Sequence, residues 1–452
     1  MQDYRDFVIK KSQIGGEHGF TPIYENDHAF DFQKFLIDWG CRQGRSAIFA
    51  DCGLGKTLMQ LIWAENVCRH TNKPVLILAP LSVSVQTVDE AEKFGMSATR
   101  VIDGKISGKA EIITTNYERL RHFDADAFGG VVCDESSILK NFDGAFKSHI
   151  TEFMRKCRYR GMFTATPSPN DYIELGTSSE ALGYLGYMDM LGMFFKNDED
   201  SLHPGFIGSA WRFKPHGERD FWRWVSSWAR AIRKPSDMGF NDRGWVLPPL
   251  HEIDHEIESP PLPGMLFAVP AKGLDEQRAE RKATIEKRCE LASALLAASD
   301  CGVSWCHLNE EADTICNMVS SAVNLSGADP DEVKEEKFRA FRSGQIKHLV
   351  TKPKIAALGV NWQHACTATY FTDYSFEQYY QAVRRMWRFG QKRPVTIHNI
   401  STESLRGVAA SRKAKAQATD RMFAQMVSYM RDAMNVNCFK EHNEEQEIPK
   451  WL

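Results

Sequence analysis

The chain has 452 residues, of which 43% are hydrophobic, and a formal net charge of -3 at pH 7. A chain of this length buries a sizeable core, and at roughly 150 residues per domain it predicts two or three domains. The near-neutral charge excludes a protein that is basic over its whole surface, so any surface that binds nucleic acid has to be local.

The cysteines and the amino terminus indicate the compartment. The chain contains 11 cysteines without a Cys-x-x-Cys pair, and several, such as Cys133 and Cys306, lie inside apolar runs, which is typical of reduced core thiols. Residues 1–11 are polar and charged, and no stretch approaches the roughly 18 consecutive apolar residues of a membrane span. We expect a soluble, non-secreted protein of the cytoplasm, in a bacterium or a phage-infected host cell, with no membrane partner.

The first part of the chain alternates apolar runs of strand length with helix-like segments. The runs are residues 47–50, 75–79, 112–114, 131–133 and 161–164. This rhythm is typical of a parallel sheet that helices cover on both faces. We predict a first α/β lobe over residues 1–170.

A glycine-rich loop joins the first of these runs to a helix-like stretch at residues 58–67. Its sequence is Asp51-Cys52-Gly53-Leu54-Gly55-Lys56-Thr57. A polyphosphate needs this pattern, because glycines let backbone N–H groups curl around its oxygens, lysine reaches the terminal phosphates and the Thr hydroxyl binds Mg²⁺. The flanking strand and helix favour this interpretation over a chance glycine-rich turn. We therefore predict that ATP and Mg²⁺ bind to Gly53, Leu54, Gly55, Lys56 and Thr57.

Two adjacent carboxylates follow the run at residues 131–133. In an ATPase with a phosphate loop, the first carboxylate after such a strand holds Mg²⁺ and the next orients the attacking water. We assign these roles to Asp134 and Glu135. Alone, such a pair is more often a solvated turn, but its position after a phosphate loop in the same lobe favours the catalytic interpretation.

Residues 171–278 have a different composition and predict an insertion and linker between two lobes. Trp211, Trp222, Trp224 and Trp228 alternate with arginines and lysines, a mixture that suits base stacking and phosphate attraction. However, Phe221, Trp224, Val225, Trp228 and Ile232 recur at helical spacing, which favours a packed core. The Pro-rich residues 248–270 indicate a linker.

A second alternation of strands and helices predicts another α/β lobe over residues 279–452. Strand-length runs lie at 303–308, 347–351, 367–372 and 395–400, after a helix-like stretch at 279–299. Cys301, Cys306, His307 and Cys316 lack the close pairs of a metal site, so core thiols are favoured. Residues 412–415 indicate the solvated face of a carboxyl-terminal brace helix, with DNA contact as the alternative.

The order of these motifs resembles the superfamily-two helicases and especially the Swi/Snf-type remodelling ATPases. In the first lobe, residues 32–34 are similar to the family's adenine-reading segment, and residues 164–167 to the motif that couples hydrolysis to movement. The resemblance implies two tandem RecA-like lobes with a mainly helical insertion. It also implies that Gln33 binds ATP and that Thr164 and Thr166 act in coupling.

Two further segments of the first lobe, residues 79–83 and 114–117, resemble the family's nucleic-acid contact motifs. The resemblance assigns contacts with the phosphate backbone to Pro80, Ser82, Thr115 and Asn116. The alternative for these four residues is ordinary turn chemistry at the ends of strands.

In the second lobe, residues 358–361 resemble the Leu-Gly-Ile-Asn element of the Swi/Snf group, and residues 381–391 resemble its final motif. The resemblance assigns nucleotide binding to Gly359 and Asn361, coupling to Gln381, and the two arginines that reach the ATP phosphates to Arg385 and Arg388. A basic helix face is the alternative for these arginines, but the matching spacing of Gln381, Gly390 and Gln391 disfavours it.

Three positions depart from the family pattern. Ala50 stands where the general phosphate loop has its first glycine, residues 134–137 read Asp-Glu-Ser-Ser in place of Asp-Glu-Ala-His, and residues 351–354 differ from the usual small-residue turn. As a whole, the resemblance implies an ATP-dependent helicase or translocase on double-stranded or branched DNA. There are two alternatives. One is an RNA helicase, with RNA as a less favoured partner, and the other is an ATP-gated nucleic-acid-binding module without strand separation. Protein partners stay unassigned.

Overall fold

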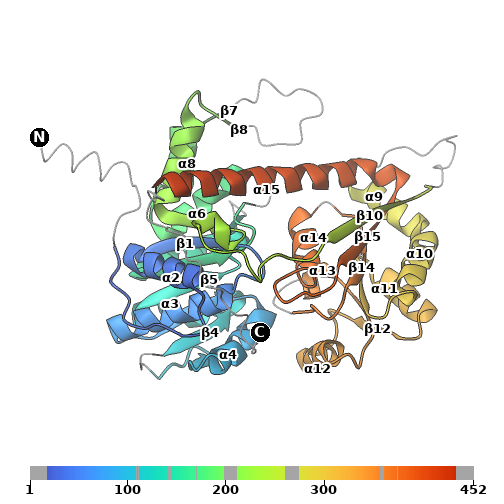
Figure 1. Ribbon diagram of the computed structural model, residues 1–452, viewed down its shortest axis with the longest axis horizontal. Helices are drawn as coiled ribbons and strands as arrows, with labels where there is room; N and C mark the ends of the chain where they lie inside the picture. The colour runs from blue at the N-terminus through green and yellow to red at the C-terminus, as the bar shows by residue number, and fades with distance from the viewer. Residues whose placement is uncertain are drawn as a thin grey trace, which may run out of the picture. The chain divides into compact units, whose positions relative to one another are not determined.

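The computed structural model describes residues 18–107, 109, 111–140, 144–168, 171–197, 211–259, 274–356, 361–373 and 375–433. The chain divides into two compact units: unit 1 comprises Met1–Trp245 and Ala418–Leu452, and unit 2 comprises Val246–Gln417. Each unit contains a parallel sheet covered by helices (Figure 1), so the predicted two-lobed α/β fold class is confirmed.

Unit 1 is built on a seven-stranded sheet whose described pairings are all parallel. In spatial order its strands are β3 (Ala98–Arg100), β4 (Ile112–Asn116), β2 (Val75–Ala79), β5 (Gly130–Asp134), β6 (Tyr159–Thr164), β1 (Arg45–Ala50) and β9 (Ala229–Ile232). Every residue of β2, β4, β5 and β6 is buried, which requires helices on both faces. The carboxyl ends of these strands share one edge of the sheet.

The helices of unit 1 are α2 (Asp31–Gln43), α3 (Lys56–Thr71), α4 (Leu81–Lys93), α5 (Ala145–Lys156), α6 (Leu175–Leu182), α7 (Tyr187–Phe194) and α8 (Gly217–Trp228). Helix α3 packs against β2, β5 and β6. Its residues are buried around most of its circumference, including Trp63 at 1% exposure, as expected for a helix in the centre of a unit. The predicted phosphate loop therefore leads into a largely buried helix of unit 1.

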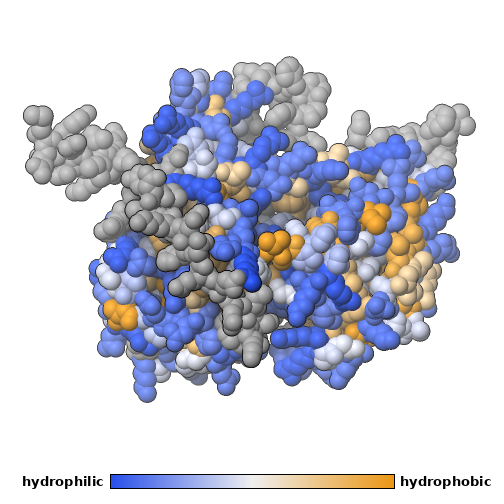
Figure 2. All heavy atoms as spheres, in the orientation of Figure 1, coloured by the Kyte–Doolittle hydropathy of each residue, from blue (hydrophilic) through white to orange (hydrophobic). Residues whose placement is uncertain are grey.

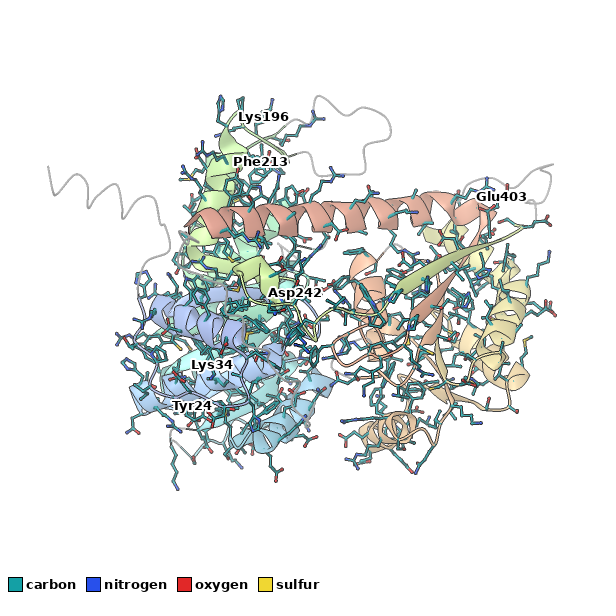
Figure 3. The ribbon with its side chains drawn as sticks, in the orientation of Figure 1. Tyr24, Lys34, Lys196, Phe213, Asp242 and Glu403 are labelled. Atoms are coloured by element: carbon teal, nitrogen blue, oxygen red, sulfur yellow. The ribbon has the colours of Figure 1, made fainter. Side chains whose placement is uncertain are left out.

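Residues 171–245, predicted to be an insertion, belong to unit 1. Strand β9 pairs with β1 over Ala47↔Ala229 to Ala50↔Ile232 and extends the sheet. On α8, Phe221, Trp224 and Trp228 are all buried, so the core interpretation of the tryptophan cluster is confirmed. The short antiparallel pair β7 (Phe195–Asn197) and β8 (Trp211–Phe213) adjoins this region, where Figure 3 labels Lys196 and Phe213.

Unit 2 contains a six-stranded sheet, again parallel in every described pairing. Its order is β10 (Leu250–Ile257), β15 (Val395–Thr402), β14 (Thr367–Phe371), β11 (Gly302–Trp305), β13 (His348–Thr351) and β12 (Ala322–Leu325). Residues 250–257, predicted to be linker, thus form an edge strand. Pro260, Pro261 and Pro263 lie outside the described residues.

The helices of unit 2 are α9 (Leu274–Ala283), α10 (Ile285–Ala297), α11 (Asn309–Met318), α12 (Asp331–Arg342), α13 (Pro353–Ala356) and α14 (Phe376–Val383), and α15 (Arg406–Ala433) begins in this unit. The stretch predicted as one helix at 279–299 is interrupted at Thr284. Arg412 is buried, with its guanidinium 4.0 Å from the centroid of the Tyr379 ring, so a solvated face is wrong for this residue.

Helix α15 also changes the expected boundaries. Its residues from Ala418 onward belong to unit 1, where Met422, Phe423 and Met426 join the hydrophobic core. The compact units therefore divide at 245/246 and 417/418, whereas the sequence placed divisions at 170/171 and 278/279. The reason is non-local: β9 pairs with β1, and the carboxyl-terminal half of α15 contacts Glu218, Arg233 and Asp237 of the same unit.

Hydrophilic residues predominate on the face of the molecule shown in Figure 2. A few large apolar side chains are nevertheless exposed, and Val246 is the most exposed of them at 80%. Among the described helices, none has both the length and the apolar character needed to cross a membrane.

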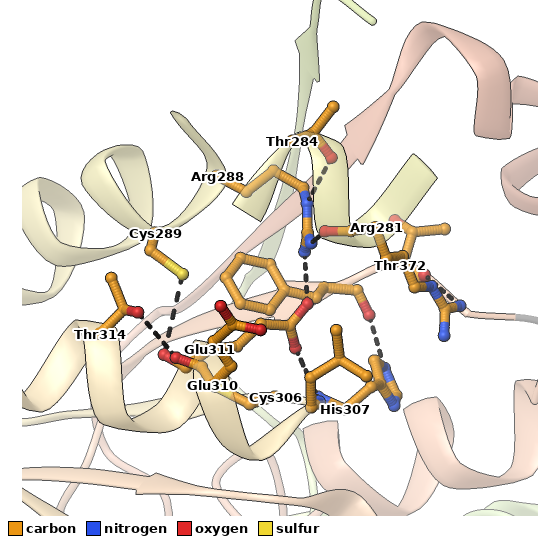
Figure 4. A network of polar contacts seen from close by, with 12 residues as sticks. Arg281, Thr284, Arg288, Cys289, Cys306, His307, Glu310, Glu311, Thr314 and Thr372 are labelled. Atoms are coloured by element: carbon orange, nitrogen blue, oxygen red, sulfur yellow. Dashed lines mark hydrogen bonds and ion pairs between the residues drawn. The ribbon is translucent and has the colours of Figure 1, made fainter. Parts of the chain in front are cut away.

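A buried ion pair organises unit 2 at the carboxyl end of β11 (Figure 4). Arg288 on α10 lies 2.6 Å from Glu311 on α11, and their side chains are 3% and 0% exposed. Glu311 also accepts hydrogen bonds from the backbone N–H groups of His307 and Leu308, at 2.8 and 3.0 Å. Burial alone raises the pKa of Glu311, but the Arg288 guanidinium and the two N–H donors outweigh it, so the pKa is lowered.

We expect Glu311→Ala to destabilise the protein by about 3–5 kcal/mol, because it leaves the buried Arg288 charge and two backbone donors unsatisfied. Its exposed neighbour offers a matched control: Glu310→Ala is expected to change stability by at most about 0.5 kcal/mol. Denaturant unfolding of the full chain measures both. Equal effects of the two substitutions would show that the ion pair does not organise unit 2.

Candidate nucleotide site

The predicted phosphate loop lies between β1 and α3, at the carboxyl edge of the unit 1 sheet. Gly53 and Gly55 have φ angles of 93° and 76°, in the left-handed region that glycine adopts without steric cost. The Lys56 ammonium donates to the backbone oxygen of Ala50 at 3.0 Å, across the loop. These backbone turns at a helix N-terminus form a concavity suited to an anion.

The loop is held at both ends by hydrogen bonds from distant segments. At its start, the Asp51 N–H donates to the Ile232 oxygen of β9 at 2.9 Å. Further along, the Gln33 amide donates to the Leu54 oxygen at 2.8 Å. Gln33 is 2% exposed, and its own side-chain oxygen accepts from the Phe30 N–H at 2.9 Å. Gln33 thus joins the beginning of α2 to the loop.

Gly55→Ala tests this arrangement, because an added Cβ would lie 2.3 Å from Gln33 Nε2. We expect a loss of about 1–3 kcal/mol of stability from the left-handed φ and the displaced glutamine, with at least a tenfold loss of nucleotide affinity. Gly95→Ala is the matched control, since Gly95 has φ +71° and open space around it. Thermal unfolding and titration with nucleotide measure both variants. Similar losses in both variants would contradict a specific role for the contact between Gly55 and Gln33.

The two predicted catalytic carboxylates follow β5 on the same sheet edge. Asp134 is 4% exposed, and its Oδ1 accepts from the Gln60 amide at 2.5 Å and from the Glu135 N–H at 3.1 Å. Burial, followed by repulsion from the Glu135 carboxylate, raises the pKa of Asp134 to about 7. Glu135 has a φ of 52°, an uncommon conformation for a residue with a side chain and one that recurs at functional sites.

Strand β6 lies between β5 and β1 and brings a further predicted residue to the carboxylates. The Thr164 hydroxyl donates to Glu135 Oε2 at 3.2 Å and accepts from the Thr166 N–H at 3.0 Å. Of the two residues predicted to act in coupling, Thr164 therefore contacts Glu135 directly, and Thr166 contacts Thr164.

Sequence reasoning missed Gln60, one helical turn after Lys56 on α3. Its side chain is 0% exposed and contacts Asp134 through Nε2, while its oxygen has no hydrogen-bond partner among the described residues. The hydroxyls of Ser136 and Thr166 are also buried, with no hydrogen-bond partner in the part of the chain that the structure describes. Carboxylate, hydroxyl and amide oxygens suit Mg²⁺ and its bound waters, so this set of residues fits the predicted cation. No single motif signals Gln60, because its role depends on the packing of α3 against β5.

The raised pKa of Asp134 predicts how stability changes with pH in the metal-free protein. The folded state holds this proton up to about pH 7, whereas an unfolded Asp loses it near pH 4. The carboxyl therefore destabilises the fold increasingly from about pH 4 to pH 7. Asp134→Asn removes this effect and is expected to stabilise the protein at pH 8 by about 2–4 kcal/mol, or several degrees in Tm.

Thermal unfolding without Mg²⁺ at pH 5 and pH 8 measures the effect, with Asp126→Asn as the control at an exposed carboxyl. The gain from Asp134→Asn has to be larger at pH 8 than at pH 5. A gain that does not depend on pH, or a loss at both values, would contradict a buried carboxyl with a raised pKa.

The residues predicted to contact nucleic acid lie at the ends of the adjacent strands β2 and β4. Pro80 precedes α4, and Ser82 lies in its first turn, although nothing is described of the Ser82 side chain. Thr115 is fully buried. Asn116 is 8% exposed, and its amide donates to Glu118 at 2.7 Å. The structure brings these residues to one sheet edge, and their contacts with nucleic acid stay a prediction.

The predicted nucleotide and coupling residues of the second lobe lie in unit 2. Arg388 donates to the side-chain oxygen of Asn361. Arg385 is 4% exposed, and its Nε donates to the backbone oxygen of Gln381 on α14 at 3.2 Å. Both arginines lie in the turns that follow α14, where a basic helix face was the alternative. Gly359 lies outside the described residues.

Unit 1 thus combines a parallel α/β sheet, a glycine-rich loop with the predicted phosphate-loop sequence, and a carboxylate pair, and nucleotide-binding proteins share this combination. No protein-family model matches the chain, and no curated protein matches it significantly. Among solved structures, the chain is similar to the SWI2/SNF2 ATPase core of Sulfolobus solfataricus in complex with dsDNA, with a TM-score of 0.44 and 16% identity over 90% of this chain and 99% of that chain. The functional assignment therefore depends on the residues of this chain.

Proposed function

We propose that the protein hydrolyses ATP with Mg²⁺ and uses the reaction to move on or remodel DNA. The observation that supports hydrolysis most strongly is the shared sheet edge of unit 1. There Lys56 follows a left-handed glycine pair, and Asp134 and Glu135 follow β5. This is the set of groups that phosphoryl transfer to water needs: a cradle for phosphates, a cation ligand and a residue that orients water.

In this proposal each side chain of the site has a separate role in binding or hydrolysing ATP. Lys56 would exchange its hydrogen bond to the Ala50 oxygen for the terminal phosphates. Asp134 and Thr57 would hold Mg²⁺, which would supply charge neutralisation. Glu135 orients the attacking water and accepts its proton, while the Thr164 hydroxyl fixes the carboxylate. Gln33 binds the adenine.

DNA as the partner is supported by the order of motifs in the sequence, which resembles the Swi/Snf-type ATPases. In that assignment Arg385 and Arg388 stabilise the charge that develops on the phosphates, and Gly359, Asn361 and Gln381 act with them. An RNA helicase and an ATP-gated binding module without turnover are the competing functions, and both would use the same phosphate loop.

Steady-state ATP hydrolysis distinguishes these functions. Rates are measured without nucleic acid and with single-stranded DNA, duplex DNA, a branched junction or RNA. We expect duplex or branched DNA to stimulate turnover, and we expect Glu135→Gln and Lys56→Ala each to lower it at least 100-fold, because each removes a group used in the transition state.

The two variants differ in binding, since Glu135→Gln leaves the phosphate cradle intact and Lys56→Ala does not. Equilibrium binding of nucleotide therefore has to survive the first substitution and weaken in the second. Stimulation by RNA alone would favour the RNA helicase, and nucleotide binding without turnover under any condition would favour the binding module.

A further inference from the structure

The chain passes between its two units twice, and both crossings are anchored on one segment of unit 1. It leaves unit 1 after Trp245 and returns at Ala418. Residues 233–245, named here the coupling segment, directly follow β9. This strand holds the start of the phosphate loop through the hydrogen bond from Asp51 to Ile232.

At the first crossing, an aromatic contact holds the end of the coupling segment. The Trp245 ring packs edge-on against Phe30 and Phe32, with ring centroids 5.1 Å apart in each case. Phe240 also contacts α2, because its ring centroid lies 6.5 Å from that of Phe35. Val246, the next residue along the chain, is 80% exposed. The ordered packing of the segment against α2 thus ends at Trp245.

The same part of α2 contacts the phosphate loop. Gln33 bonds to the Phe30 N–H on one side and to the Leu54 oxygen on the other. Trp245 is therefore linked to the loop through two residues: the Phe30 ring contacts Trp245, and the Phe30 N–H donates to the side chain of Gln33. Figure 3 labels Lys34 on α2 and Asp242 in the coupling segment.

At the second crossing, the unit 1 half of α15 contacts the beginning of the coupling segment. Asp420 forms an ion pair with Arg233 at 2.8 Å, and the Arg233 guanidinium lies 4.5 Å from the Phe423 ring centroid. Arg431 donates to the backbone oxygens of Asp237, at 2.9 Å, and Ser236. The helix that returns from unit 2 is thus fixed to the same segment.

Two carboxylates form hydrogen bonds within the coupling segment. Asp237 accepts from the N–H groups of Arg233 and Lys234, at 2.7 and 3.1 Å. Asp242 accepts from both the N–H and the hydroxyl of Ser236, each at 2.7 Å. The Trp245 N–H donates to the Asp242 backbone oxygen at 2.8 Å, so hydrogen bonds connect the two ends of the segment.

We propose that the coupling segment transmits nucleotide occupancy of the phosphate loop to both connections with unit 2, and that Trp245 is the positioning residue at the first connection. A polyphosphate in the loop restrains residues 51–55. Because Asp51 bonds to β9 and Leu54 bonds to Gln33, the coupling segment is restrained from both ends. The inference rests on the proposed nucleotide site and adds the path by which that site reaches the rest of the chain.

Hydrogen exchange tests the proposal without requiring DNA. Amide exchange is followed with and without Mg²⁺ and ATP in the Glu135→Gln background, in which we expect turnover to be at least 100-fold slower. Peptides covering residues 51–60 report binding, those covering 240–250 report the first crossing, and those covering 418–433 report the second. We expect nucleotide to slow exchange at all three places by at least about threefold.

In Trp245→Ala, we expect nucleotide still to slow exchange at residues 51–60 but no longer at 240–250. In Trp245→Phe, we expect the slowing at 240–250 to return. Trp211→Ala is the matched control, because Trp211 is also partly buried but lies on β8. Arg431→Ala is expected to lose the effect at 418–433 alone. A purely structural role for Trp245 would instead raise exchange equally with and without nucleotide.

Two results overturn the proposal while leaving ATP binding in place. One is slowing at residues 51–60 with none at either crossing in the parent protein. The other is unchanged slowing at 240–250 in Trp245→Ala. If residues 51–60 show no slowing, the proposed nucleotide site itself fails, and the coupling fails with it.

Discussion

The structure of the candidate site depends on two hydrogen bonds that hold the phosphate loop between parts of the chain distant in sequence. Gln33 reaches the loop from α2, and Ile232 reaches it from β9. A loop with two left-handed glycines loses much conformational freedom on folding, and these contacts oppose that loss. They also explain why residues 171–245 belong to unit 1, since β9 has to occupy the sheet edge beside β1.

The carboxylate pair lowers the stability of the fold at the place where the proposed chemistry needs these two residues. Asp134 is buried with its pKa raised, and Glu135 has a left-handed backbone. Both features destabilise the protein without its ligand, and structures retain such features mainly at functional sites. Mg²⁺ would relieve the first cost, because a bound cation favours the ionised carboxylate. We therefore expect bound Mg²⁺ to stabilise the folded protein.

The sequence was sufficient for the parts whose signal is local. Residues 75–79 form β2 as predicted, and the runs at 131–133 and 161–164 lie inside β5 and β6, because fully buried parallel strands read as continuous apolar runs. The phosphate loop and the Asp-Glu pair follow strands as their motifs require. Asp134, Glu135 and Thr164 then meet because neighbouring parallel strands end at the same edge.

The rest required information that lies far away in the sequence. Strand β10 reads as a charged segment before a Pro-rich stretch, and it becomes a strand only because β15 pairs with it along its full length. β9 follows a tryptophan-rich helix and is defined by its pairing with β1. Gln60 and Trp245 belong to no motif, and their importance appears only when α3 packs on β5 and when residues 240–245 pack on α2.

The most direct test of the central claim is a crystal structure of the protein with Mg²⁺ and a non-hydrolysable ATP analogue. We expect the polyphosphate to occupy the loop at residues 51–57, Lys56 to leave the Ala50 oxygen for a phosphate, and the cation to be held beside Asp134 and Thr57. A nucleotide bound elsewhere, or a Lys56 that keeps its bond to Ala50 when nucleotide is bound, would contradict the proposed site.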